Sequence, residues 1–366
     1  MTVEESNKVK GIAVLLMFWT HLFTGSYLIL PTSRWFSLLG QAAMNKIAYA
    51  GTVCLFMFIF CSGYGLYRSS FLKPADWRKD LRRIFGILVP YWLIMDATIL
   101  WLAAHHRFEP RVFLINLFAL SHNDESLYVT FSWFIKVYLE LLILLPLMRA
   151  AERKNGRNPL KDFLLYIALP AALQLFLQRK MPAYEGQRMV YYGLYTVNEF
   201  VTVLPSFYAG VLCAKYQVFE KLKARFAAAP SWPVTLAALA VFAGMLLVRQ
   251  AIPMLSFGCL DWAEVILLVC CLLLIFGHAP FHSRRALPYL GSRSLHYWLL
   301  SGSFFLNTSE LQFIVYLPQY VPLVVLWEAV VETPFVMFFD GASRQILAIP
   351  EKLALRRQAR SGDNSC

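Results

Sequence analysis

Charged residues are scarce in this chain of 366 residues. They make up 15% of the sequence, whereas about a quarter of a typical soluble domain is charged. Hydrophobic residues make up 58%, and the mean hydropathy is +0.53. No stretch has the composition of a soluble catalytic domain, and no internal repeat or low-complexity tract is visible. Any active site must therefore lie within a membrane domain.

Cysteine is too sparse and too irregularly placed to form a framework. The seven cysteines are odd in number, and most of them lie inside apolar runs. This pattern predicts neither a disulfide framework nor a metal site, and we expect no permanently bound cofactor. A removable signal peptide is also lacking, because the first apolar run has no small-residue cleavage site and further runs follow it. We therefore expect this first run to stay in the membrane as an anchor.

Long apolar runs are what the sequence has instead. Repeated runs of about 18 to 25 residues match the length that a helix needs to cross a hydrocarbon core of roughly 30 Å. We predict an all-α, polytopic membrane helix bundle with about ten transmembrane helices. Residues 1–340 would form this membrane domain, and residues 341–366 a basic cytoplasmic tail. The predicted spans are residues 11–30, 47–67, 84–104, 133–148, 163–177, 198–214, 234–248, 262–276, 289–306 and 314–338. Residues 105–130, the largest polar stretch of the first half, are expected to form an external cap or re-entrant segment.

The distribution of Lys and Arg predicts the orientation. With the N-terminus inside, 25 of the 34 basic residues fall on the cytoplasmic side, eight fall outside, and Lys136 lies within a span. Because cytoplasmic loops carry the positive excess, we expect an even number of crossings, with both termini in the cytoplasm of a cell (cytoplasmic) membrane protein. The net charge of +12 then reflects topology and contact with anionic membrane lipids, and it does not indicate nucleic-acid binding.

One histidine lies deep in the first predicted span. His21 follows Lys10 by eleven residues, about 16 Å along a helix and close to the middle of the membrane. A structural histidine bonded to a neighbouring helix and a functional histidine are equally good interpretations of this position alone. Near neutral pH, an uncharged imidazole can accept a proton from a hydroxyl group.

Arg82 and Arg83 stand just before the third predicted span. One interpretation is that they belong to the ordinary positive charge of a cytoplasmic loop. The other is that they form a clamp for phosphate, because guanidinium groups pair with phosphate oxygens through two parallel hydrogen bonds.

Several other ionisable residues fall at membrane depth, where each is costly unless it is paired or faces water. They are Asp96, Lys136, Glu140, Glu199, Glu328 and Glu332. Lys136 and Glu140 are four residues apart on one helix face, which favours an internal ion pair. Around Ser62–Gly65, small residues would let two helix backbones approach closely.

Six segments, in their order along the chain, resemble acyltransferase family 3. They are Lys10 to His21, Phe56 to Tyr67 (FMFIFCSGYGLY), Arg82 to Trp92 (RRIFGILVPYW), Ser132 to Met148, Gly291 to Leu300 (GSRSLHYWLL), and Glu332 with Pro334. The family's first motif is a basic residue and a catalytic histidine with ten residues between them, as between Lys10 and His21. This chain differs at three places. It has Lys10 where the family usually has arginine, Gly86 interrupts the arginine signature, and Ser301 stands where a histidine often ends the late helix.

The resemblance implies a membrane-bound O-acyltransferase that moves an acyl group, most often acetyl, from cytoplasmic acyl-CoA to a hydroxyl of a cell-envelope glycan or a lipid-linked glycan precursor. His21 would be the general base, and Lys10, Arg82 and Arg83 would bind the acyl-CoA. Candidates for the substrate pocket are Ser62, Tyr64, Tyr91, Trp133, Glu140 and Glu332. The acceptor, the acyl chain and the oligomeric state, a homo-oligomer included, stay open.

The main alternative is a transporter or exporter of an envelope precursor or small metabolite. Buried carboxylates such as Asp96, Glu140 and Glu199 would then be substrate or proton sites. Paired Gly- or Pro-broken helices at matching positions in two halves, which would support a transporter, are not visible in the sequence. A structural or signalling protein without chemistry would leave His21 and the ordered motifs unexplained.

Overall fold

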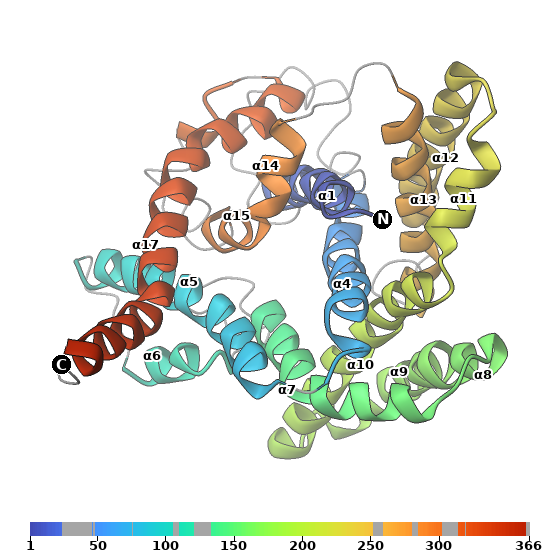
Figure 1. Ribbon diagram of the computed structural model, residues 1–366. Coiled ribbons are helices and arrows are strands. Elements are labelled where there is room, and N and C mark those ends of the chain that lie inside the picture. Colours follow the sequence, from blue (N-terminus) through green and yellow to red (C-terminus); the bar gives the residue numbers. More distant parts are fainter. Residues whose placement is uncertain are drawn as a thin grey trace. The chain divides into compact units, whose positions relative to one another are not determined.

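The structure, a computed structural model, is predominantly helical over the residues that it describes. It describes residues 1–23, 46, 48–74, 76–104, 110–120, 133–251, 259–279, 285–301, 314–318 and 320–363. No strand occurs among these residues (Figure 1), so the predicted all-α class is confirmed. The chain separates into two compact units, each described here by itself. Unit 1 comprises Met1–Ala75, Leu144–Ser294 and Tyr316–Trp327, and unit 2 comprises Asp76–Ile143, Leu295–Val315 and Glu328–Cys366.

Six helical segments are long and apolar enough to cross a membrane. They are Ala50–Phe71, Trp77–Leu100, Pro159–Tyr184, Met189–Lys215, Ser231–Arg249 and Asp261–His278. Each overlaps one predicted span. The other four predicted spans fall on the helices α1, α7, α14 with α15, and α17, and their residues 24–30 and 302–306 lie outside the described part of the chain. The protein is a multi-pass membrane protein, and the count of ten helices stays a prediction.

Unit 1 is built around one wholly apolar helix. Its elements are α1 (Val3–Phe23), η2 (Ala50–Thr52), α4 (Val53–Leu66), η3 (Tyr67–Phe71), the end of α7 (Trp133–Lys154), α8 (Pro159–Phe163), η4 (Leu164–Ala168), α9 (Leu169–Lys180), η5 (Met181–Tyr184), α10 (Arg188–Lys215), α11 (Val218–Phe226), α12 (Ser231–Ala251), α13 (Asp261–His278) and α14 (Ala286–Ser292). Helix α4 has no charged residue, and nearly all of its side chains are buried. A helix that is apolar on every side is stable only when it is surrounded, and α1, α10 and α13 pack against α4.

Glycines allow the closest helix contacts of unit 1. A Cβ atom added to Gly63 on α4 would overlap the carbonyl of Phe207 on α10, and one added to Gly210 would overlap the carbonyl of Phe60. The predicted close approach in Ser62–Gly65 is therefore found, at Gly63. By contrast, a Cβ at Gly65 would meet nothing within 4 Å.

Glycines also allow close contact between α1 and α14, which lie side by side in Figure 1. A Cβ at Gly11 would overlap the carbonyl of Leu287, and one at Gly291 would overlap the carbonyl of Asn7. Small residues at helix interfaces let membrane helices approach to backbone contact. The glycine that follows Lys10 is thus required by packing.

Unit 2 contains fewer helices, and polar contacts link them. Its elements are α5 (Trp77–Ala104), α6 (Pro110–Leu117), the first part of α7, α15 (Ser294–Leu300) and most of α17 (Val321–Asp363). The Tyr91 hydroxyl donates to the carbonyl of Asn116 (2.7 Å), and the Trp92 indole N–H donates to that of Leu117 (2.9 Å). These bonds fasten α5 to the end of α6.

Two predicted segments extend beyond the described part of the chain. Of the expected external segment 105–130, the structure describes residues 110–120, which contain α6, and the remainder lies outside the described residues. Of the predicted tail 341–366, residues up to Asp363 continue α17 as a helix.

Candidate active site

Helix α1 carries the predicted base and one predicted phosphate-binding residue. It is continuous from Val3 to Phe23, so Lys10 and His21 are separated by about 16 Å along one axis. Eleven residues are close to three full turns of 3.6 residues each, and the two side chains therefore leave the same face of the helix. His21 is buried, with 5% of its surface exposed.

The end of α1 around His21 is held by hydrogen bonds from distant parts of unit 1. The Thr20 hydroxyl lies 3.0 Å from the carbonyl of Leu16 and 3.1 Å from that of Ala48. The Tyr316 hydroxyl donates to the carbonyl of Leu22 (2.9 Å). The residues on both sides of His21 are thus anchored, which fixes the direction from which the imidazole extends.

A buried ion cluster supports the element next to this end. Arg249 of α12 is buried and donates to Asp261 (2.9 Å), to Glu264, and to the Thr52 hydroxyl of η2 (3.2 Å). Element η2 packs against α1. A buried guanidinium is stable only when carboxylates and further hydrogen bonds compensate it. The sequence prediction counted Arg249 only among the external charges, although Asp261 and Glu264, one turn apart at the start of α13, are a signal for a buried partner.

Helix α1, which carries Lys10, packs against α4, which carries the SGY segment. The Ser62 hydroxyl donates to the carbonyl of Phe58 (2.9 Å). The Tyr64 hydroxyl donates to Glu220 (3.1 Å) and accepts from the amino group of Met1 (2.6 Å). Unit 1 therefore brings Lys10 and the segment with Ser62 and Tyr64 together along the α1–α4 contact.

The two predicted arginines of α5, in unit 2, have different surroundings. Arg83 donates to Asp80 (2.9 Å), one turn earlier and itself buried. Arg82 is exposed and lines a cavity of about 740 Å³ together with Arg78. Neighbours on a helix point about 100° apart, so the pair seen in the sequence is not a single clamp with one direction. The role of Asp80 was not predicted, although its position three residues before Arg83 is a signal for such a bond.

Other predicted pocket residues of unit 2 lie on α5 and α7. Tyr91 is completely buried, and its hydroxyl is bonded to Asn116 as described above. Trp133 begins α7, with its ring 6.4 Å from that of Phe134. Glu140 follows about two turns later and is half-buried.

Glu332 is part of a buried acidic pair on α17. Glu328 and Glu332 are four residues apart, one turn of the helix, and both are completely buried. Ser301 donates to Glu328 (2.9 Å), and the hydroxyls of Tyr297 and Thr333 are 2.7 Å apart. Ser301, at the place where the family often has a histidine, therefore bonds one carboxyl of the pair. This contact was not predicted, because it joins residues far apart in sequence.

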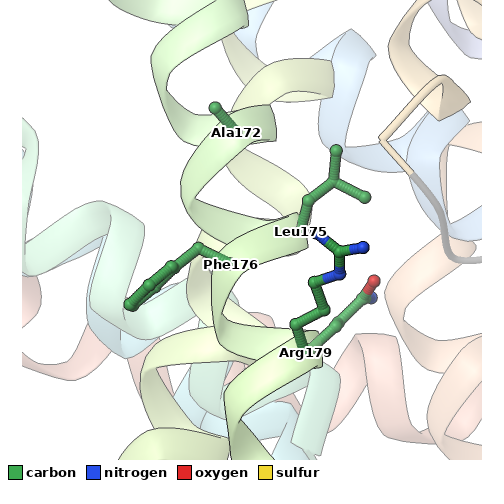
Figure 2. Close-up of a pocket in the computed structure, with 5 residues that line it drawn as sticks. Ala172, Leu175, Phe176 and Arg179 are labelled. Atoms are coloured by element: carbon green, nitrogen blue, oxygen red, sulfur yellow. The ribbon is translucent and has the colours of Figure 1, made fainter.

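A second cavity, of about 620 Å³, lies along α9 in unit 1 (Figure 2). Figure 2 shows Phe176 directed to one side of the helix, and Leu175 and Arg179 to the other. None of the predicted site residues is among its described lining residues. In the described part of the chain, no group of His, Cys, Asp and Glu is arranged to hold a metal ion.

Comparison with known proteins decides the family. A family model described as "Acyltransferase domain" (acyltransferase family 3) matches residues 5–339, nearly the whole chain. The chain belongs to acyltransferase family 3. No curated protein and no solved structure gives a significant match. With its apolar helices, this family member is a multi-pass membrane acyltransferase.

The predicted site residues of this acyltransferase fall into two groups. Lys10, His21, Ser62 and Tyr64 belong to unit 1, whereas Arg82, Arg83, Tyr91, Trp133, Glu140 and Glu332 belong to unit 2. The roles of these residues in catalysis stay predictions.

Proposed function

We propose that this acyltransferase transfers an acyl group, typically acetyl, from acyl-CoA on the cytoplasmic side to a hydroxyl of a cell-envelope glycan or a lipid-linked glycan precursor. The observation that supports this most is the placement of His21, which is buried and shares one face of a continuous helix with Lys10. A buried ionisable group at membrane depth marks a functional site by default.

His21 acts as the general base. Its neutral imidazole accepts the proton of the acceptor hydroxyl while the hydroxyl oxygen bonds to the thioester carbonyl carbon. The carbon–sulfur bond then breaks, and the CoA sulfur leaves with the electron pair. The imidazolium returns its proton to this sulfur, so an ester and free CoA are the products.

Lys10, Arg82 and Arg83 bind the CoA phosphates. Charge-assisted hydrogen bonds to phosphate are the strong ones in proteins. The bond to Asp80 holds the Arg83 guanidinium in one orientation before the donor arrives. Ser62, Tyr64, Tyr91, Trp133, Glu140 and Glu332 line the path of the substrates. Ten membrane helices with both termini in the cytoplasm, in the cytoplasmic membrane, complete the proposal.

Label transfer tests the activity. Purified protein in nanodiscs is incubated with acetyl-CoA labelled in the acetyl group and with envelope glycan, and the sugar is analysed for covalent label. Label on a sugar hydroxyl is expected. A transporter would leave the glycan unlabelled and would instead move the glycan or a small metabolite into proteoliposomes, which would contradict the proposal.

Acyl-CoA affinity tests the arginines. Each of Arg82→Ala and Arg83→Ala is expected to weaken acyl-CoA binding about tenfold or more, because a hydrogen bond to a charged group contributes about 1.5–3 kcal/mol. Arg225→Ala, which removes an exposed arginine of α11, is the control and should bind normally. Unchanged affinity in both α5 variants would leave these arginines with a role in topology alone.

A further inference from the structure

An open groove runs along unit 2 between α5 and the far end of α17. It is the cavity of about 740 Å³ that Arg82 lines. Arg78 and Arg82 lie toward one end of the α5 side, and the α17 side is formed by Ile346, Leu347 and Pro350. Neither Arg78 nor these α17 residues belong to the predicted donor site.

The basic end of the groove fits a phosphate group. Arg78 and Arg82 are one helical turn apart on the same face, and both are exposed. Trp77, 67% exposed, lies under the Arg78 guanidinium, with the ring centroid 5.5 Å from Cζ. Tryptophan and arginine are the residues that membrane proteins place at the headgroup level. A single guanidinium group such as that of Arg78 can bind a phosphate through two parallel hydrogen bonds.

The remainder of the groove fits a hydrocarbon chain. Beyond Arg82, α5 contributes Phe85, Val89, Trp92 and Leu93, and Asp96 lies at the far end of this side. Leu93 is eleven residues from Arg82, about 16 Å, and this length matches one leaflet of a hydrocarbon core roughly 30 Å thick. An apolar groove of one leaflet's depth with cationic side chains at the membrane surface has the shape and charge pattern of a phospholipid.

We propose that this groove binds one anionic phospholipid of the surrounding bilayer. Its phosphate contacts Arg78, which is not part of the predicted donor site, and one of its acyl chains lies along α5 against Ile346 and Leu347. Acyl-CoA fits this groove less well, because among the described lining residues beyond Arg82 the amides of its pantetheine arm would meet only two polar side chains, those of Trp92 and Asp96. The Trp92 indole N–H already donates to Leu117, and unpaired amides are costly in an apolar site.

Chain-brominated lipids test the site, because bromine quenches nearby tryptophan and Trp92 lines the groove. The full-length protein is reconstituted in nanodiscs of unlabelled phosphatidylcholine with increasing fractions of brominated phosphatidylglycerol or brominated phosphatidylcholine. Half-maximal quenching should need a smaller fraction of phosphatidylglycerol, by about fivefold for each arginine near the membrane surface. Equal fractions for the two lipids would overturn the proposal.

Three variants test whether the preference for phosphatidylglycerol arises in this groove. Arg78→Gln should raise the required fraction of phosphatidylglycerol about fivefold, and it leaves the predicted donor residues intact. Lys221→Gln removes an exposed charge on α11 and should change nothing. An equal effect of both variants would mean a general charge effect and would overturn the site. Trp92→Phe should remove most of the lipid-specific quenching and leave only a contribution from Trp77 at the basic end of the groove. Undiminished quenching in this variant would place the lipid elsewhere.

A second readout covers the case in which Trp92→Phe is unstable. Native mass spectrometry counts the phosphatidylglycerol molecules retained by purified wild type and by Arg78→Gln. The wild type should retain one molecule more than the variant, and equal counts would overturn the proposal. Acyl transfer is not measured in either experiment, so the outcome is independent of the proposed function.

Discussion

The helix contacts around α1 and α4 in unit 1 differ in kind from the contact between α15 and α17 in unit 2. In unit 1, Gly11, Gly291, Gly63 and Gly210 bring backbone directly against backbone. In unit 2, side chains make the contact, through Ser301 with Glu328 and Tyr297 with Thr333. The first kind of contact tolerates no added atom, and the second depends on each polar group keeping its partner. His21 lies on α1, which packs through contacts of the first kind. The position of α1 is therefore set by direct packing of backbone against backbone.

The largest effect is expected from a single methyl group at the α4–α10 contact. Gly63→Ala would overlap the carbonyl of Phe207 and should lower the free energy of unfolding by about 1–3 kcal/mol, as overpacking does. Gly65→Ala, two residues away with open space around it, is the matched control. Thermal unfolding in detergent should show a lower melting temperature for Gly63→Ala alone. Equal melting temperatures for the two variants would mean that the helices do not pack through Gly63.

A smaller effect is expected where side chains make the contact. Ser301→Ala removes the hydrogen bond to Glu328 and should cost about 0.6 kcal/mol, with an upper value of about 1.7, as measured for side-chain hydrogen bonds between membrane helices. Ser292→Ala is the control and should have the stability of the wild type, because the exposed Ser292 hydroxyl bonds to near neighbours in sequence: it donates to the carbonyl of Tyr289 (2.9 Å) and accepts from Arg293 (3.5 Å). If Ser301→Ala is no less stable than Ser292→Ala, the polar contact contributes nothing.

The smallest effect concerns the ion pair between the start of α1 and α11. Lys223 lies 2.5 Å from Glu5. Burial raises the pKa of the Glu5 carboxyl, but the bonds from Lys223 and the Thr2 backbone outweigh burial and hold the pKa below its usual 4.5. A lowered pKa in the folded state means that the stabilisation is present above pH 4.5 and is lost as the pH falls through the folded-state value.

Glu5→Gln should therefore cost about 0.2–1 kcal/mol at pH 7 and progressively less in acid. Melting temperatures of wild type and Glu5→Gln, measured across this pH range, test the sign. A difference that grows on acidification would contradict it.

The parts of the site that could be predicted from sequence are those set by spacing along one helix. The separation of Lys10 from His21, and the close approach at Gly63, follow from helix geometry and residue size alone. The bond from Ser301 to Glu328 and the groove between α5 and α17 could not be predicted, because each joins segments far apart in sequence. The burial of Arg249 was missed for a related reason, since a charge near the end of a span looks the same whether it faces water or a carboxylate.

The most direct test of the account is label transfer by His21→Ala. Loss of a general base should slow transfer of labelled acetyl to glycan by about 10²–10⁴-fold, with acyl-CoA affinity and melting temperature close to those of the wild type. His278→Ala, which removes a histidine bonded to the carbonyls of Leu274 and Phe226 on α13 and α11, should retain transfer. Full transfer by a stably folded His21→Ala protein would contradict the account.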